Sequence, residues 1–370
     1  MRILFVLPGM HRVHRGAEVA IGSVANEIAS AGKDEVVVAG SGPEDDSVSY
    51  QYRKSHLIRR EKFERWPTFP VMRSEYVWEE ASFAAGFLPH YRPRNFDVTV
   101  TCSYPFVNWI LARWPPIGRR PPHIYVTQNG DWPPSSDDKE YRWFRCDGLV
   151  CTNPDYYERN RVRWPSALIP NGFDPARFHP GEGSRERFEL PGDVLIVLMV
   201  SALVPSKRVL EGMEAVAKIP NAFLVAAGDG PLRSDVDAYA EAVLPGRFRR
   251  LTLPASEMPY LYRTADVFLH PTLYESFGNV YVEALATGIP IVVHDYSVTR
   301  WIFGDHHPGL VDTTDIGAVT AALRDATIRG RDDPARSTDA AARFAWSRVA
   351  EGYRSFLADV VEGRVGDPHS

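Results

Sequence analysis

Two glutamates, Glu275 and Glu283, lie eight residues apart around the start of an expected helix. The apolar run Val267–His270 predicts a buried strand, and Val280–Ala286 has the helical spacing and the strong helix formers of a short helix. Gly278, in the loop between them, would let the backbone come close to a ligand. A helix start offers unpaired N–H groups and a positive dipole end, so this stretch predicts a phosphate site.

The presence of an acid near this helix has a different explanation for Glu275 than for Glu283. An acid near a helix start complements the helix dipole, which would account for Glu275 without any ligand. Glu283 shares a helical face with Val280 and Ala286, and an unpaired carboxylate among apolar neighbours is costly. The vicinal hydroxyls of a ribose or a hexose would supply the donors that this carboxylate needs. Residue chemistry alone therefore leaves a sugar-nucleotide site and a dipole-complementing pair both open.

Two further stretches place candidate phosphate ligands at helix starts. The apolar run Val194–Ser201 predicts a strand, and the segment after it ends in Lys207 and Arg208 before a helix. These cations are either surface charge or a clamp for a diphosphate. Gly16 follows the strand Ile3–Leu7 at a helix start, where it either admits a phosphate or has no ligand.

The elements around these residues alternate strands with helices. This alternation predicts an α/β protein with parallel sheets, whose ligand groups follow the strand ends. The remaining helix is expected after Thr313, running to about Glu362. Further strands are expected at Glu35–Ala39, Val98–Cys102, Ile124–Thr127, Gly148–Cys151, Ala222–Ala227, Arg250–Leu253 and Ile289–His294.

Glu275-Ser-Phe-Gly-Asn-Val-Tyr-Val-Glu283-Ala-Leu-Ala-Thr-Gly-Ile-Pro resembles the paired-glutamate signature of the retaining nucleotide-sugar glycosyltransferases of family 4. The segment Ile169–Pro180 is similar to the linker of that family. The resemblance implies the GT-B fold, in which two Rossmann-like domains face each other across a cleft and the C-terminal helix crosses back to the first domain. It also implies an acceptor-side domain at 1–170 with the helix 346–363, a linker at 171–182, and a nucleotide-sugar-binding domain at 183–345.

The resemblance also assigns roles to residues. Glu283 would hold the ribose diol, Glu275 the hydroxyls of the transferred sugar, and Lys207 the diphosphate. Asn129 occupies the position of a histidine near the donor sugar, and Ala202 that of a diphosphate-binding arginine. The expected catalytic residues are Glu275, Lys207 and Asn129, and the expected donor-binding residues are Gly16, Arg208, Phe277, Gly278, Asn279, Val280 and Glu283.

The expected activity is retaining transfer of a sugar from a nucleoside diphosphate, with uridine as the expected base. The acceptor would be a hydroxyl of a glycan, a glycolipid or a natural-product precursor, and neither a metal nor a cofactor is expected. Asn129 and Ala202 keep a silent sugar-nucleotide-binding subunit open as an alternative, and an isomerase or phosphorylase on the same fold is another.

Composition excludes several partners and locations. The net charge of -5 argues against nucleic-acid binding, and no apolar run has the length of a membrane span. The three cysteines lack metal-ligand spacing, so they predict reduced thiols in a cytoplasmic protein. Six basic residues between 53 and 65 are mixed with aromatic residues. They form either a solvated face or a contact with an anionic acceptor or a lipid surface, which leaves peripheral membrane contact open.

Overall fold

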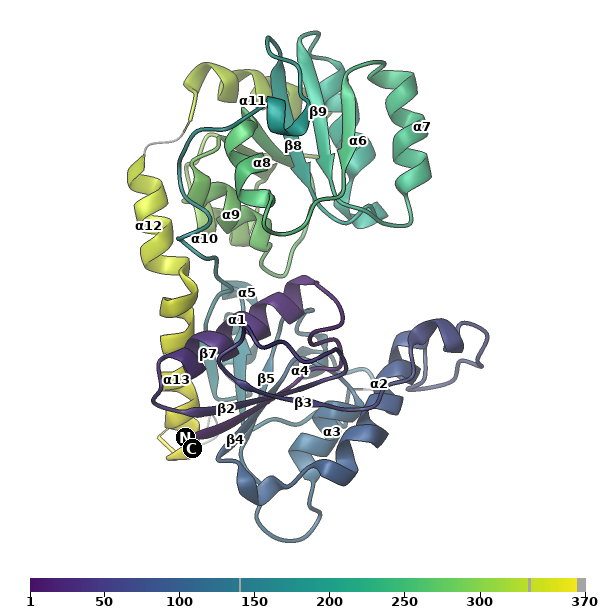
Figure 1. The fold of residues 1–370 in the computed structure, drawn as a ribbon, viewed down its shortest axis with the longest axis vertical. Coiled ribbons are helices and arrows are strands. Elements are labelled where there is room, and N and C mark those ends of the chain that lie inside the picture. Colours follow the sequence, from purple (N-terminus) through teal and green to yellow (C-terminus); the bar gives the residue numbers. More distant parts are fainter. Residues whose placement is uncertain (140, 332–333, 365–370) are drawn as a thin grey trace. The chain divides into compact units, whose positions relative to one another are not determined.

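A computed structural model describes residues 1–139, 141–331 and 334–364. The chain forms two compact units (Figure 1). The first unit contains Met1–Asn171 together with Trp346–Ser370, and the second contains Gly172–Ala345. The chain therefore leaves the first unit near the expected linker and returns to it with the last helix.

The described part of the first unit contains a sheet of seven parallel strands in the order β3-β2-β1-β4-β5-β6-β7. β1 lies near the middle, where Ile3 pairs with Val36 on one side and with Val98 on the other. The elements of this unit are β1 (Arg2–Val6), α1 (Gly16–Ser30), β2 (Glu35–Gly40), β3 (Gln51–Lys54), α2 (Glu75–Phe87), β4 (Val98–Thr101), α3 (Phe106–Arg113), β5 (His123–Val126), α4 (Trp132–Ser135), β6 (Gly148–Cys151), α5 (Pro154–Asn160), β7 (Ser166–Leu168) and α13 (Trp346–Val361).

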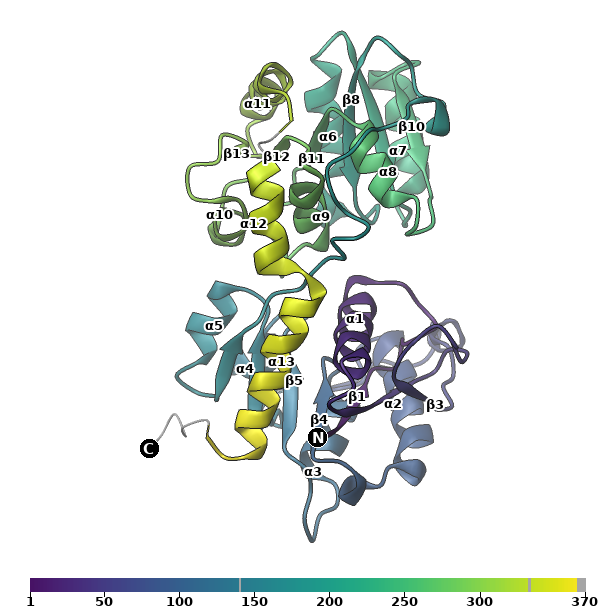
Figure 2. The same cartoon turned by 60° about the vertical axis from the view of Figure 1, so that its left-hand side comes forward.

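Alternate residues of β1 face two apolar layers. Ile3 and Phe5 pack with residues of α1 and α13, whereas Leu4 and Val6 pack with α2 and α3. α13 lies beside α1 and covers one face of the sheet with it (Figure 2). Because both faces are covered, the central strands β1, β2, β4, β5 and β6 are almost entirely buried, as central parallel strands are.

The described part of the second unit contains a sheet of six parallel strands in the order β10-β9-β8-β11-β12-β13. Its elements are β8 (Leu195–Val200), α6 (Val209–Ala217), β9 (Ala222–Ala227), α7 (Arg233–Val243), β10 (Phe248–Leu251), α8 (Met258–Thr264), β11 (Val267–His270), α9 (Asn279–Thr287), β12 (Ile291–His294), α10 (Ser297–Phe303), β13 (Leu310–Val311), α11 (Ile316–Arg329) and α12 (Pro334–Phe344).

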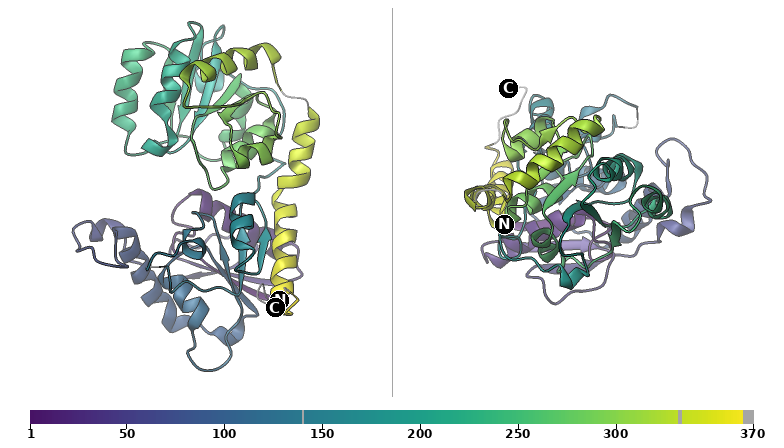
Figure 3. Two further views of the ribbon diagram at one scale, coloured as in Figure 1. Left: turned by 180° about the vertical axis from the view of Figure 1, so that it is seen from behind. Right: turned by 90° about the horizontal axis from the view of Figure 1, so that it is seen from above.

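Helices cover both faces of this second sheet as well (Figure 3). Ile196 and Leu198 of β8 face a core shared with α8, α9, α10 and α12. Val197 and Met199 face the opposite core, which α6, α7 and α11 complete. Both units are therefore doubly wound α/β layers, which confirms the expected fold class.

Two element predictions need correction. β10 lies at Phe248–Leu251, two residues before the expected Arg250–Leu253, because its apolar signal is weak and interrupted by two arginines. The segment after Thr313 is not one continuous helix but α11, α12 and α13. Gly330 ends α11 with a φ of 71°, and Ala345 separates α12 from α13 by bridging to Phe173.

Candidate functional site

The strand order of the second unit indicates where a ligand binds. β9 lies on one side of β8 and β11 lies on the other, so the chain direction across the sheet reverses at β8. Open parallel sheets bind ligands beyond the carboxyl ends of the strands at such a reversal. The two segments that begin there are the loop after β8, which contains Lys207, and the loop after β11, which contains Glu275.

The loop after β11 turns into α9 at Gly278. This glycine has a φ of +81°, a region that other residues rarely adopt, and a Cβ there would lie 2.6 Å from the ring of Tyr281. Phe277 is buried in the core beneath the turn, whereas Asn279 and Val280 in the first helical turn are partly exposed. The sequence thus folds the helix start tightly and keeps it within reach of a ligand.

Lys207 and Glu275 meet at this edge of the sheet. The Lys207 Nζ donates to the Glu275 carboxylate, and His270 Nε2 lies 3.1 Å from the same Oε1 atom. The Tyr296 hydroxyl accepts the backbone N–H of Glu275 at 3.1 Å. The loop that carries Glu275 is therefore anchored through both its side chain and its backbone.

The Glu275 carboxylate is prepared to stay ionised. Burial acts to raise its pKa, but the hydrogen bond and charge of His270, together with the charge of Lys207, outweigh burial and lower the pKa. The Lys207 side chain is 22% exposed, and an ammonium group has three N–H donors. Lys207 can therefore donate to a bound oxyanion while it keeps its contact with Glu275.

Glu283 lies on α9 with a different partner. Its Oε2 accepts a hydrogen bond from the buried Tyr262 hydroxyl at 3.0 Å, and the side chain stays partly exposed. Burial raises the pKa of Glu283 to about 7, against the opposing effects of the Tyr262 hydrogen bond and the charge of Arg177. A carboxyl group with one donor and this pKa can accept further hydrogen bonds from a diol.

Arg208 has a more constrained setting than its sequence neighbour. It adopts a left-handed backbone conformation, with a φ of 52°, directly before α6. Its Nε donates to Glu211 at 3.2 Å, and its Nη1 is buried without a hydrogen-bond partner among the described residues. The positive charge of Arg208 also acts to lower the pKa values of His294, the last residue of β12, and of Asp312, directly after β13.

The other expected site residues belong to the first unit. Gly16 is the exposed first residue of α1, and Asn129 is exposed just after the end of β5. Gln128 beside it is buried and exchanges two hydrogen bonds with Asn171, at 2.6 and 2.9 Å. Ala202 is exposed in the loop after β8 of the second unit.

Three residues of the candidate site could not be predicted from the sequence. His270 and Tyr296 hold Glu275, and Tyr262 binds Glu283. His270 was visible only as the polar end of an apolar strand, and nothing in the spacing marks Tyr262, which is 21 residues before its partner.

Neither a metal cluster nor a membrane-crossing helix is found in the part of the chain that the structure describes. Residues 1–139, 141–331 and 334–364 contain no group of three or more His, Cys, Asp and Glu side chains that could hold a metal. No helix in these ranges is long and apolar enough to cross a membrane.

The second unit matches a known protein family. Residues 182–342 match the family described as Glycosyl transferases group 1. A D-inositol 3-phosphate glycosyltransferase of Stackebrandtia nassauensis is 31% identical over 54% of this chain and 50% of its own length. A GDP-mannose-dependent phosphatidylinositol monomannoside mannosyltransferase of Mycolicibacterium smegmatis is 32% identical over 48% of this chain and 53% of its own length. The chain thus spans about half the length of these curated relatives.

Solved structures resemble nearly the whole chain. The sucrose-phosphate synthase of Thermosynechococcus elongatus superposes with a TM-score of 0.78 at 18% identity, covering 98% of this chain and 99% of its own. The Anabaena protein HepE, solved in complex with UDP-glucose, gives a TM-score of 0.70 at 16% identity, covering 97% and 100%. At these identities the likeness shows a shared fold.

Proposed function

We propose that the chain is a retaining glycosyltransferase of family 4, because its residues 182–342 match the family Glycosyl transferases group 1 and its fold is GT-B. It moves a sugar from a nucleoside diphosphate to a hydroxyl group of an acceptor. The observation that supports the proposal most strongly is the ion pair between Lys207 and Glu275 beside the start of α9. A cation, a helix dipole and a carboxylate are the groups that a sugar diphosphate needs.

Each residue has a role in this proposal. Lys207 and the first turn of α9 offset the charge that develops on the departing diphosphate, without a metal ion. Glu275, kept ionised, accepts hydrogen bonds from the hydroxyls of the transferred sugar. Glu283 accepts hydrogen bonds from the ribose diol. Reaction on one face of the sugar, with the leaving phosphate taking the acceptor proton, would retain the anomeric configuration.

Positioning supplies the rest of the rate enhancement. Fixed donors and acceptors hold the donor sugar in one orientation, which lowers the entropic part of the barrier. His270 and Tyr296 serve this purpose indirectly, because they hold the side chain and the backbone of Glu275. Arg208, with an unsatisfied buried Nη1 atom, is proposed to assist at the diphosphate. Gly16 and Asn129 are proposed to contact the donor from the first unit.

We propose UDP as the nucleotide of the donor, a proposal supported by the binding of UDP-glucose to a protein of the same fold. A relative that uses GDP-mannose makes guanosine the competing base. The free, buried Cys102, Cys146 and Cys151 support a reducing, cytoplasmic location. Peripheral membrane contact stays a prediction.

A turnover assay tests the function. The full chain is incubated with UDP-glucose, UDP-galactose or GDP-mannose and a panel of hydroxyl acceptors, and both free nucleotide and the anomeric configuration of the product are measured. We expect nucleotide release with retention of configuration. Tight nucleotide binding without release across the whole panel would favour a silent binding subunit, the alternative to which Asn129 and Ala202 point.

A further inference from the structure

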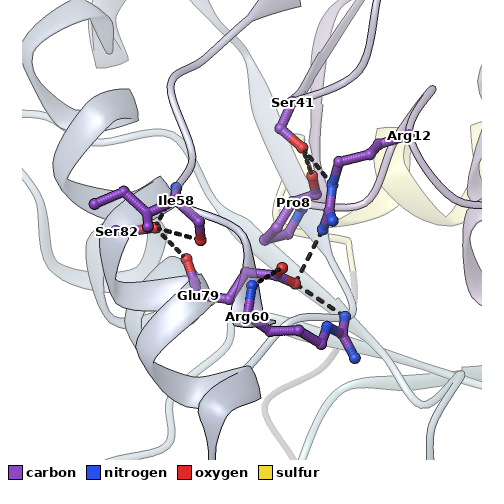
Figure 4. Close-up of polar contacts among 7 residues, drawn as sticks. All are labelled: Pro8, Arg12, Ser41, Ile58, Arg60, Glu79 and Ser82. Carbon is purple, nitrogen blue, oxygen red and sulfur yellow. Dashed lines mark hydrogen bonds and ion pairs between the residues drawn. The ribbon is translucent and has the colours of Figure 1, made fainter. Parts of the chain in front are cut away.

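A second charged cluster lies in the first unit, and it shares no side chain with the Lys207–Glu275 site of the second unit. It gathers at the carboxyl end of β1, where the strand order reverses between β2 and β4. Its central members are Arg12 in the loop after β1, Arg60 in a 3-10 turn, and Glu79 on α2 (Figure 4). The same rule of parallel sheets that locates the donor site therefore marks this edge as a ligand position.

One carboxylate oxygen serves both arginines. The Nη2 atoms of Arg12 and of Arg60 each donate to Oε1 of Glu79 at 2.9 Å, and the backbone N–H of Arg60 donates to Oε2 at 2.9 Å (Figure 4). The Glu79 side chain is 2% exposed. Burial acts to raise its pKa, but its hydrogen bonds to Arg60 and Arg12 outweigh burial and lower the pKa. Glu79 stays charged, so the trio carries one net positive charge.

Hydrogen bonds hold the Arg12 side chain and the backbone before Arg60 in place. Arg12 Nε donates to the Ser41 hydroxyl at 3.0 Å, and Ser41 donates to the carbonyl of Pro8 at 2.6 Å. The segment before Arg60 is tied to α2 because the Ile58 N–H donates to the Ser82 hydroxyl at 2.9 Å (Figure 4). The two guanidinium groups are thus preorganised, which lowers the entropic cost of binding a ligand.

Both guanidinium groups keep donors for a ligand. Arg12 uses Nε and one Nη atom and Arg60 uses one Nη atom, whereas a guanidinium group has five N–H donors. Their side chains are 16% and 24% exposed, and the Arg60 guanidinium lies over the ring of Tyr76 at 5.6 Å from its centroid. The contacts with Glu79 therefore leave N–H donors of both guanidinium groups available to a ligand.

We propose that Arg12 and Arg60 bind an oxyanion of the acceptor, so that the acceptor is an anionic molecule with a phosphate monoester or a carboxylate group. This inference rests on the proposed function, because it assigns the acceptor side of the same reaction to the first unit. Planar guanidinium forks match both groups with paired hydrogen bonds. Glu79 is a positioning residue, which holds the two forks side by side without contacting the ligand.

Arginine modification by phenylglyoxal tests the proposal on the unaltered full chain. Mass spectrometry follows the modification rate of Arg12, Arg60 and Arg94 in chloride, acetate or phosphate at equal ionic strength. Arg94 is exposed on the same unit and has no ion pair with any residue that the structure describes, so it is the internal control. We expect acetate or phosphate to slow modification of Arg12 and Arg60 by about tenfold, as for a charge-assisted fork, while Arg94 is unchanged. Whichever anion protects better identifies the acceptor group.

Three results would overturn the proposal. The first is equal modification rates of Arg12 and Arg60 in all three salts. The second is protection by UDP alone as strong as that by phosphate, because the oxyanion would then belong to the donor. The third is unchanged protection of Arg12 by phosphate in the Arg60→Gln variant. An Arg60→Lys variant that restores part of the protection shows that lost charge, not misfolding, explains the Arg60→Gln result.

Failure of this proposal and failure of the proposed function are distinguishable. The anion experiment requires neither donor nor turnover, so protection by phosphate can be present in a chain that transfers no sugar. Conversely, a transferase with a neutral acceptor would release nucleotide while Arg12 and Arg60 stay unprotected.

Discussion

At the scale of single residues, the proposed donor site depends on the difference in pKa between two carboxyl groups. Glu275 has two basic neighbours and a lowered pKa, whereas Glu283 has a tyrosine hydroxyl and a pKa of about 7. One acid is therefore a fixed negative charge that organises Lys207, and the other changes its charge near neutral pH. Two similar residues eight positions apart thus have different chemistry, set by their surroundings.

Replacing Lys207 by alanine is expected to lower kcat by about 10²–10³-fold, because the cation acts on charge that develops on the leaving diphosphate. The dissociation constant of the donor should rise by less than about tenfold, since the helix start still binds the ground state. Steady-state kinetics and titration calorimetry measure the two effects separately. Lys218→Ala is the matched control, because Lys218 is exposed and its pair with Glu214, at 3.5 Å, is worth little. Equal kinetics in the two variants would contradict the assignment of Lys207.

We expect the nucleotide affinity to depend on pH, because Glu283 titrates near neutral pH. In the empty protein its pKa of about 7 leaves much of the carboxyl protonated at neutral pH. The ribose diol donates to the carboxylate, so affinity for UDP should rise as the pH increases from about 6 to about 8 and then level off. Calorimetric titrations across this range measure the effect. Glu283→Gln should bind more weakly and lose this component, leaving only the titration of the nucleotide. If the affinity for UDP depends on pH in the same way in the unaltered chain and in Glu283→Gln, Glu283 does not contact the ribose.

At the scale of elements, the start of α9 depends on a residue without a side chain. Gly278 has both a positive φ and a neighbouring ring at the position of an added Cβ. The turn therefore joins a polar loop to the largely buried helix α9. It also sets the direction of the first backbone N–H groups of that helix. The hydrogen bond from the Glu275 N–H to the Tyr296 hydroxyl fixes the middle of the same loop.

Gly278→Ala is expected to lower the free energy of unfolding by about 1–3 kcal/mol and to weaken donor binding, because the turn must shift. Gly246→Ala is the control for backbone strain alone: its φ is +69° but no atom lies within 4 Å of an added Cβ. That variant should lose about 1 kcal/mol and keep its donor affinity. Denaturant unfolding and calorimetry measure both quantities. Full donor affinity in Gly278→Ala would show that the helix start does not hold the diphosphate.

The sequence predicted the long apolar elements better than the short ones. β11 begins and ends as expected at Val267–His270, because its first three residues form a continuous apolar run that is typical of a buried parallel strand. β3, β7 and β13 have only two to four residues each at or near the sheet edges, and too few apolar residues to stand out. The interruption near Gly330 was missed because a single glycine inside a helical pattern is ambiguous.

The site residues that lie close together in the sequence could be predicted, whereas the contacts between distant segments could not. The loop and helix around Gly278 were visible because their residues are contiguous. The approach of Lys207 to Glu275 joins segments 68 residues apart, and only the resemblance to a family suggested it. Partners such as Tyr262 depend on which helix packs on which, and periodicity does not encode that information.

At the scale of the whole molecule, each unit repeats one plan with different chemistry. Both sheets are parallel, covered on both faces, and have polar loops at the carboxyl ends of their central strands. The second unit places a lysine, two acids and a helix start there, which suits a sugar diphosphate. The first unit places the Arg12–Glu79–Arg60 cluster there, which suits an anionic group. In this proposal the acceptor is bound by the first unit and the diphosphate of the donor mainly by the second.

The most direct measurement is a crystal structure of the full chain with a non-reactive analogue of the donor sugar nucleotide. We predict a diphosphate oxygen within hydrogen-bond distance of Lys207 Nζ and of the backbone at the start of α9, with the ribose hydroxyls donating to Glu283. A nucleotide bound elsewhere on the molecule, with the Lys207–Glu275 pair and the α9 start empty, would contradict it.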